Sequence, residues 1–399
     1  MTGLKTWLIA GTGKSNKSDN MKLNRARIGI LFYFSSQWMG GIIYIINLVK
    51  ILNHLEEEKK PEIFVFYRPE LKRFLNEFNY PYLNLIEWSY PSVIKGTLLS
   101  LLTRKNLFVD NMLNSYELDA VFPLHDFPVK TRTNVKLISW WADLQHRYYP
   151  EFFTPMQNRG RELRIKNILK NCGHLVLSSQ DVFDDFRQFY KIRDDMRVYI
   201  YHFVSVIENT EGVNINDLRL KYNLPEKYFL VSNQFHKHKN HKVVLQAVAK
   251  LKEEGFNLNL AFTGKLPSAQ DSPYLGEIHH LIEDNDLHRQ VNILGVIPRN
   301  DQLAIMRHSQ AVIQPSLFEG WSTVIEDAVS LQVPVIASGL KVNKEQLGKD
   351  GCYFEPHDFE ALAAILKCHP ERDLSKLYYP DYNKRIREAA NLLYDIFIS

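Results

Sequence analysis

The stretch that decides the fold runs from Pro315 to Ala328 and reads PSLFEGWSTVIEDA. An apolar segment precedes it and ends at Gln314, and a second apolar segment follows from Val333. This pattern predicts a strand, a turn that contains a glycine, and a helix that begins at Ser322-Thr323. Free backbone N–H groups at a helix start, with the helix dipole behind them, favour a phosphate. We therefore expect an anion-binding turn between a parallel strand and a helix.

The polar residues of this stretch have two interpretations. Ser322 or Thr323 can simply cap the helix, while Glu326 and Asp327 simply complement its dipole. Alternatively, Glu319 accepts hydrogen bonds from sugar hydroxyls, and an acid about one turn into the helix holds a ribose diol, as acids do in dinucleotide sites. From the residues alone, both interpretations stay open.

Outward from this stretch, short apolar runs alternate with amphipathic segments, which predicts an α/β fold with parallel sheets. Strands are expected at 27–34, 63–67, 120–122, 135–140, 175–178, 198–202, 228–232, 258–263, 291–294, 311–314 and 334–337. Helices are expected at 41–55, 162–169, 182–189, 241–252, 274–283, 301–306, 323–331, 359–366 and 383–397.

The chain of 399 residues exceeds what one hydrophobic core usually organises, so two domains are expected. We predict a flexible tail over 1–24 and a first Rossmann-like domain over 25–205, completed by the helix 383–397. A linker over 206–217 leads to a second Rossmann-like domain over 218–370. Two doubly wound domains leave a cleft between the carboxyl ends of their sheets.

Composition limits the compartment and the partners. The net charge of +4 suits an anionic ligand or an anionic membrane face, and it is too small to indicate nucleic acid. Cys172, Cys352 and Cys368 form no CxxC pair, which favours the reducing cytoplasm over a disulfide framework. The uncharged segment Ile28–Val49 is long enough to cross a bilayer, but its polar centre and Gly40-Gly41 favour a strand, a turn and a helix.

The Pro315–Ala328 stretch resembles the signature of family 4 glycosyltransferases of the GT-B fold, and the resemblance extends over Val291–Gly295 and Gly351–Asp358. It is strong over about 218–366. It implies two Rossmann-like domains facing a central cleft, and a retaining glycosyltransferase that takes a nucleotide-sugar donor. The family has two glutamates here, separated by seven residues. The first falls on Glu319.

The second acid is ambiguous. An ungapped match places it at Asp327, and Glu326 stands one residue early. Adjacent residues of a helix point about 100° apart, so only one of the two can face the ribose well. The spacing favours Asp327.

The segment from Ser232 to His241 reads SNQFHKHKNH and follows a predicted strand. In the family an Arg and, five residues later, a Lys hold the donor diphosphate. Lys239 matches the Lys, whereas Gln234 stands at the Arg position, so His238 or Lys237 would have to supply the second contact. The three histidines of this segment have no Cys or carboxylate nearby, which disfavours a metal site.

In the first domain, Gly40 and Gly41 fall where the family commonly has a glycine pair near the donor phosphates. The segment 140–153, WWADLQHRYYPEFF, resembles a segment of a subgroup of these enzymes, and His146 falls where the family places a histidine beside the donor sugar. Arg159, Arg161 and Arg164 can face an anionic acceptor or form a solvated helix face.

The resemblance thus assigns catalytic roles to Glu319, His146 and Lys239. It assigns donor binding to Gly40, Gly41, Gln234, Lys239, Gly320, Ser322, Thr323, Val324, Glu326 and Asp327.

No metal and no cofactor beyond the donor substrate are expected, and the acceptor is a glycan or a lipid-linked molecule. The protein would act in polysaccharide biosynthesis, in the cytoplasm or at the inner face of its membrane. The rival interpretations are a nucleotide-sugar epimerase of GT-B architecture and a catalytically silent sugar-nucleotide-binding protein. A P-loop at Ala10–Ser15 is disfavoured because Leu8 stands where its first glycine should be.

Overall fold

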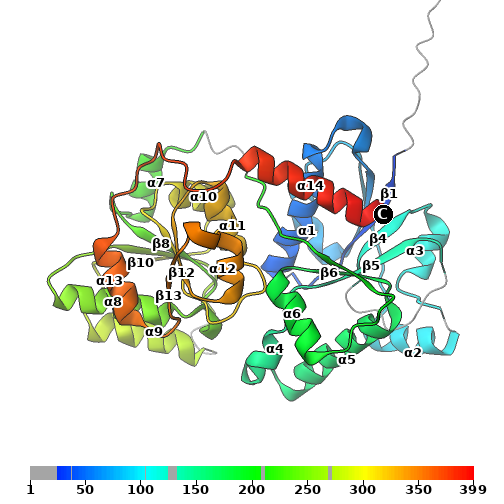
Figure 1. Ribbon diagram of the computed structural model, residues 1–399, viewed down its shortest axis with the longest axis horizontal. Coiled ribbons are helices and arrows are strands. Elements are labelled where there is room, and N and C mark those ends of the chain that lie inside the picture. The colour runs from blue at the N-terminus through cyan, green and yellow to red at the C-terminus, as the bar shows by residue number, and fades with distance from the viewer. Residues whose placement is uncertain (1–24, 37, 104, 125–132, 208–211, 268–271) are drawn as a thin grey trace, which may run out of the picture.

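The computed structural model describes residues 25–36, 38–103, 105–124, 133–207, 212–267 and 272–399. The predicted tail 1–24, with the P-loop-like segment inside it, lies outside the described residues. Two lobes lie side by side, and each contains a parallel sheet with helices packed around it (Figure 1). This is the α/β, GT-B architecture that the sequence predicts.

The N-terminal lobe contains a parallel sheet of seven strands in the order β3-β2-β1-β4-β5-β6-β7. The strands are β1 (Arg27–Phe32), β2 (Glu62–Tyr67), β3 (Leu83–Glu87), β4 (Ala120–Leu124), β5 (Lys136–Trp141), β6 (His174–Leu177) and β7 (Arg197–Ile200). The α-helices are α1 (Met39–Ile51), α2 (Val93–Thr103), α3 (Asp110–Ser115), α4 (Gln145–Tyr148), α5 (Pro155–Asn171) and α6 (Gln180–Phe189). Short 3₁₀ helices occur at Leu52–His54, Glu57–Lys59, Pro69–Glu77 and Pro150–Phe152.

The C-terminal lobe contains a parallel sheet of six strands in the order β10-β9-β8-β11-β12-β13. The strands are β8 (Phe229–Ser232), β9 (Leu260–Thr263), β10 (Val291–Gly295), β11 (Val312–Gln314), β12 (Val335–Ser338) and β13 (Cys352–Phe354). The α-helices are α7 (Ile215–Tyr222), α8 (His241–Glu253), α9 (Pro273–Asp284), α10 (Arg299–Arg307), α11 (Thr323–Ser330), α12 (Lys341–Leu347) and α13 (Phe359–Cys368). Short 3₁₀ helices occur at Lys237–Lys239 and Gly348–Asp350.

The last helix, α14 (Tyr382–Ile398), lies across the N-terminal lobe (Figure 1). Its apolar side chains, among them Ile386, Leu393 and Phe397, are buried in the same core as strand β1 and helix α1. Helix α14 also contacts the C-terminal lobe, because Arg385 donates to Glu326 at 2.6 Å. The chain therefore crosses back and ties its two lobes together.

Several elements differ from the sequence-based expectation. The structure adds β3, which was not expected because its side chains are half-exposed and form no apolar run. Helix α5 begins at Pro155 rather than at 162, because Thr154 and Gln157 form a capping box upstream of the apolar residues. Helix α7 begins at Ile215, inside the predicted linker 206–217.

The uncharged segment Ile28–Val49 forms most of strand β1 and helix α1. Most of its apolar side chains in β1 and α1 are buried in the core that also contains α14, which explains why the segment has no charged residue in these two elements. Among the helices within the described residues, none combines the length and the hydropathy needed to cross a membrane.

Candidate active site

A cavity of about 1200 Å³ separates the two lobes. The loops after β1 and β5 form its N-terminal wall, and the loops after β8, β9, β10 and β11 form its C-terminal wall. All of these loops follow the carboxyl ends of parallel strands, which is where α/β folds bind ligands. This cavity is the candidate site.

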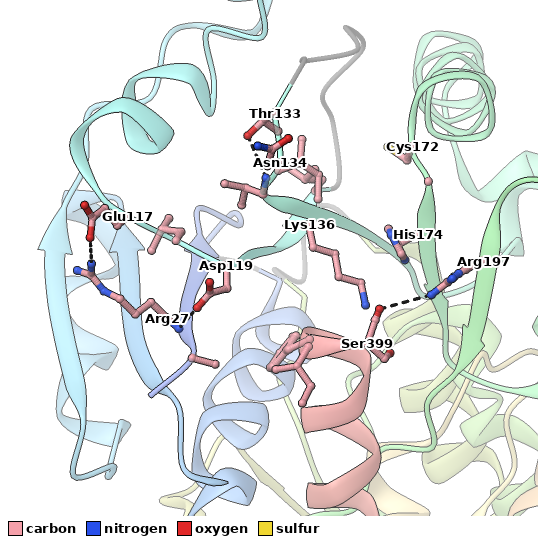
Figure 2. Close-up of a pocket in the computed structure, with 18 of the residues that line it drawn as sticks. Arg27, Glu117, Asp119, Thr133, Asn134, Lys136, Cys172, His174, Arg197 and Ser399 are labelled. Atoms are coloured by element: carbon pink, nitrogen blue, oxygen red, sulfur yellow. Dashed lines mark hydrogen bonds and ion pairs between the residues drawn. The ribbon is translucent and has the colours of Figure 1, made fainter. Parts of the chain in front are cut away.

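A second cavity, of about 1170 Å³, lies at the opposite, amino-terminal edge of the first sheet (Figure 2). Its charged groups already contact protein atoms: the backbone N–H of Arg27 donates to Asp119 at 2.7 Å, and Lys136 donates to the Ile396 carbonyl at 2.6 Å. Burial and neighbouring cations lower the pKa of His174 to about 4, so its ring is neutral near pH 7. The charged groups of this second cavity are already paired with protein atoms. We therefore place the active site in the cavity between the lobes.

Glu319 is held in a fixed orientation in the cavity between the lobes. One of its carboxylate oxygens accepts hydrogen bonds from Lys239 at 2.6 Å and from the Gln314 amide at 2.8 Å. Its side chain is only 9% exposed. Glu319 and Lys239, which the sequence places 80 residues apart, therefore form one ion pair on the wall of the cavity.

Ser322 is the N-cap residue of α11, because its hydroxyl accepts a hydrogen bond from the N–H of Ile325 at 3.2 Å. The capping interpretation is thus confirmed for Ser322. Thr323 and Val324, the first two residues of the helix, line the cavity together with Ser322. A cap and an exposed helix start are compatible, so the predicted phosphate contact at α11 stays a prediction.

Glu326 and Asp327 point in different directions. Glu326 does not line the cavity; it is 1% exposed and contacts Arg385 and the Gln346 amide at 2.6 and 2.9 Å. Burial raises the pKa of Glu326, and Arg385 opposes that rise. The helix therefore turns the side chain of Glu326 toward α14 and away from the cavity, and the spacing argument for Asp327 is the one that agrees with this geometry.

Asp327 faces the cavity but is already paired. Arg299 donates to both of its carboxylate oxygens, at 2.7 and 2.5 Å. Asp327 is 3% exposed, and the guanidinium of Arg299 also lines the cavity. A ligand that approaches this position contacts Arg299 as well as Asp327. Nothing in the sequence indicated this arginine.

We expect Glu326→Gln and Asp327→Asn to have different effects. Glu326→Gln leaves Arg385 without its buried counter-charge, so it should lower the free energy of unfolding by about 2 kcal/mol, since Arg385 keeps some contact with water. Asp327→Asn also takes a buried charge from an arginine, but Arg299 is 39% exposed, so the loss of stability should be smaller, about 1 kcal/mol, while the donor KM should rise. Urea denaturation and donor KM measured on both variants check this, and the reverse pattern would contradict the assignment.

The segment that contains Lys239 lies on the C-terminal wall. Gln234, His238 and Lys239 line the cavity, and the amide oxygen of Gln234 accepts a hydrogen bond from Nε2 of His236 at 3.0 Å. Burial and the charge of Lys239 lower the pKa of His238 to about 2. His238 is therefore neutral near pH 7, which argues against it as the cation that compensates for Gln234.

Lys265 is a cation of this wall that sequence reasoning missed. It lines the cavity and is exposed, and its carbonyl accepts the N–H of Phe235 at 3.1 Å, so it lies beside the Gln234 segment. No ion-pair partner of Lys265 is found among the described residues. Its sequence signal is weak, because a lone lysine after a glycine is common in loops.

The predicted glycine pair is divided between two roles. Gly40 lines the cavity, whereas Gly41 is buried and does not. A Cβ at Gly41 would lie 2.6 Å from the Trp38 ring, so this glycine makes room for an indole. Gly40 alone of the pair therefore faces the cavity, and the donor-binding assignment of Gly41 has no support from this geometry.

His146 points away from the cavity. It is 4% exposed, its Nε2 lies 3.0 Å from Glu162 of α5, and it is not among the residues that line the cavity. Burial lowers its pKa. The expected place beside the donor sugar is thus not observed, because α4 turns its neighbours Asp143 and Gln145 to the cavity instead. His146 therefore connects α4 to α5 through Glu162, and the catalytic role that the resemblance gives it stays a prediction.

Gly320 lies where the two lobes contact each other. A Cβ at Gly320 would overlap the carbonyl oxygen of Ala142 and lie 2.8 Å from the Cβ of Asp143. The next residue, Trp321, donates its indole N–H to the Phe203 carbonyl at 3.0 Å. The turn that contains Glu319 therefore packs directly on the N-terminal lobe.

Sequence comparison shows which known proteins this chain resembles. Residues 215–373 match the model of the family "Glycosyl transferases group 1". The chain is 25% identical over 226 residues to the O-antigen chain mannosyltransferase RfbU of Salmonella typhimurium, covering 56% of this chain and 58% of RfbU. It is 33% identical over 115 residues to the putative glycosyltransferase EpsF of Bacillus subtilis, covering 29% of this chain and 28% of EpsF.

Solved structures support the fold. HepE of Anabaena, in complex with UDP-glucose, superposes with a TM-score of 0.62 at 15% identity, covering 93% of this chain and 96% of HepE. WaaG, a glycosyltransferase of lipopolysaccharide biosynthesis, superposes with a TM-score of 0.56 at 14% identity, covering 93% and 95% of the two chains.

The two-lobed fold is the GT-B fold of these solved glycosyltransferases. Residues 215–373 are thus similar to the glycosyl transferases group 1 family, and the chain spans 58% of the length of RfbU.

Proposed function

We propose that the protein is a retaining glycosyltransferase that moves a sugar from a nucleotide-sugar donor to a glycan or lipid-linked acceptor in polysaccharide biosynthesis. The observation that carries the proposal is the ion pair between Glu319 and Lys239 beside the start of α11, in the cavity between the lobes. Two similar proteins support it: RfbU is a mannosyltransferase of the O-antigen chain, and HepE has been solved with UDP-glucose.

The arrangement suggests how the reaction proceeds. The acceptor oxygen forms a bond to the anomeric carbon on the face from which the diphosphate leaves, and the departing diphosphate oxygen takes the acceptor's proton. Lys239, Lys265 and the N–H groups at the start of α11 would stabilise the charge that develops on the diphosphate. Glu319 would hold sugar hydroxyls with the lone pairs that Lys239 and Gln314 leave open.

We propose that transfer needs no metal ion. The chain has a D-x-D pattern at Asp284-Asn285-Asp286, but it lies at the end of α9, where Asp286 pairs with Lys252 at 2.9 Å and does not line the cavity. The cations of the C-terminal wall would take over the neutralisation that a divalent ion supplies in other transferases.

We also place the protein in the cytoplasm, free or at the inner face of the membrane. Two of its three cysteines, Cys352 and Cys368, are exposed free thiols, which suits a reducing compartment.

The test is transfer from an α-linked nucleotide sugar in the presence of EDTA, with the product examined by NMR. We expect turnover to survive EDTA and the new linkage to have the α configuration. A β-linked product would exclude the retaining mechanism, and strict dependence on Mg²⁺ or Mn²⁺ would exclude metal independence. A donor converted to its epimer without transfer would favour the epimerase interpretation.

A further inference from the structure

Helix α2 presents its large apolar side chains to the outside and its small ones to the protein. Gly96 and Ser100 are buried, whereas the larger residues of the same helix are exposed. The exposed fractions are 75% for Ile94, 57% for Leu98, 49% for Leu99, 58% for Leu101 and 79% for Leu102. A surface helix of a water-soluble lobe normally does the opposite, so this face is built for contact with something apolar.

Packing fixes this orientation. The hydroxyl of Ser100 accepts the N–H of Leu107 at 3.1 Å, and a Cβ at Gly96 would lie 2.6 Å from the ring of Phe108. Only small side chains fit between α2 and the segment after it. The helix therefore cannot turn its leucines inward without losing both contacts.

The charge of the segment matches an anionic surface. From Trp88 to Val109 the sequence contains no Asp or Glu, but it contains Lys95, Arg104 and Lys105. Lys95 and Lys105 are exposed. An apolar helix face flanked by cations is the pattern of a helix that lies in the interface of an anionic bilayer.

We propose that α2 docks the protein on an anionic lipid membrane, with its leucines in the interface and its lysines at the headgroups. A second copy of the chain is a poorer occupant. A symmetric contact through α2 would bring Lys95 and Lys105 of both copies together with no acid of the same segment to pair them.

The docking surface adjoins the candidate active site. Phe108, which packs on Gly96, also lines the cavity between the lobes, as does Tyr90. Figure 1 shows α2 at the border of the N-terminal lobe, on the side away from the C-terminal lobe. Docking would therefore bring the N-terminal wall of the cavity near the lipid surface. If the proposed function holds, on which this step rests, the acceptor is a lipid-linked one.

The experiment is sedimentation of the full chain with vesicles of phosphatidylcholine, with and without phosphatidylglycerol. We expect binding to the anionic vesicles that weakens with salt, and a loss on the order of ten-fold in Leu98→Ser/Leu102→Ser, because two exposed apolar side chains leave the interface. Lys95→Gln/Lys105→Gln should lower binding to the anionic vesicles only. The matched control, Leu220→Ser/Leu377→Ser, changes two leucines of the C-terminal lobe that are 85% and 77% exposed, and it should bind like the wild type.

Absence of binding to anionic vesicles at low salt would overturn the proposal, as would equal binding by the α2 variant and the control. So would a concentration-dependent dimer in light scattering that Leu98→Ser/Leu102→Ser abolishes, because it would make α2 a contact between copies. Vesicle binding requires no donor and no transfer. A protein that binds vesicles but moves no sugar would therefore contradict the proposed function and leave the docking surface intact.

Discussion

Glu319→Gln is expected to reduce kcat/KM by a factor of roughly 30 to 800, which corresponds to about 2–4 kcal/mol of transition-state stabilisation. The amide keeps the size of the side chain but removes the charge opposite Lys239, which now lies 2.6 Å from the carboxylate. It also replaces acceptor lone pairs that sugar hydroxyls need. Purified variants are compared in a transfer assay, and circular dichroism verifies the fold.

The control for this variant is Glu277→Gln. Glu277 also pairs with a lysine, Lys242 at 2.9 Å, but both side chains are more than 40% exposed and neither residue lines the cavity. The control should retain wild-type turnover, because exposed pairs contribute little. If Glu319→Gln works as well as the control, Glu319 has no part in transfer.

Gly320→Ala is expected to reduce kcat/KM by about 150-fold, equivalent to about 3 kcal/mol, the upper range for overpacking. The added methyl would overlap the Ala142 carbonyl of the other lobe. To relieve that overlap the two lobes must move apart, which carries Glu319 of the C-terminal lobe away from the N-terminal wall of the cavity. Kinetics measures the loss, and small-angle scattering should show a larger radius of gyration.

Gly276→Ala is the matched control, because nothing lies within 4 Å of a Cβ at Gly276 in helix α9. It should leave the rate unchanged and raise stability slightly, since alanine favours a helix over glycine. Equal rates for the two alanine variants would mean that the lobes do not approach each other this closely during turnover.

The architecture was predictable because it depends on periodic patterns. Strands of a parallel sheet are buried on both faces and read as apolar runs, so β1, β8 and β11 were recognisable from sequence. The edge strand β3 was not, because its half-exposed residues carry no such run. Helix α2 was missed for a related reason: its apolar residues face outward, so their pattern does not indicate a buried helix face.

The motif of the site was predictable from the sequence, but the directions of its side chains were less so. Glu319, Lys239 and Gly320 meet in one cavity, as the resemblance implies. The direction of a single side chain is set by tertiary contacts that no local pattern contains. Glu326 turns to Arg385, which lies 59 residues away, and His146 turns to Glu162.

Arg299 is a cavity residue that local sequence patterns could not reveal. Nothing in its local sequence links it to Asp327, yet it occupies both oxygens of that acid at the cavity wall. Lys265 reaches the cavity only because the turn after β9 packs on the Gln234 segment. Such residues are found only when the strands are placed side by side.

The central claim is that the cavity between the lobes binds a nucleotide sugar through Lys239. Calorimetric titration of UDP, GDP, ADP and TDP into the wild type and into Lys239→Ala tests it most directly. We predict saturable binding of at least one nucleotide by the wild type, weakened about ten- to a hundred-fold in Lys239→Ala, the range for a lost hydrogen bond to a charged group. Binding of none of the four nucleotides, or equal affinity in the two proteins, would contradict the account.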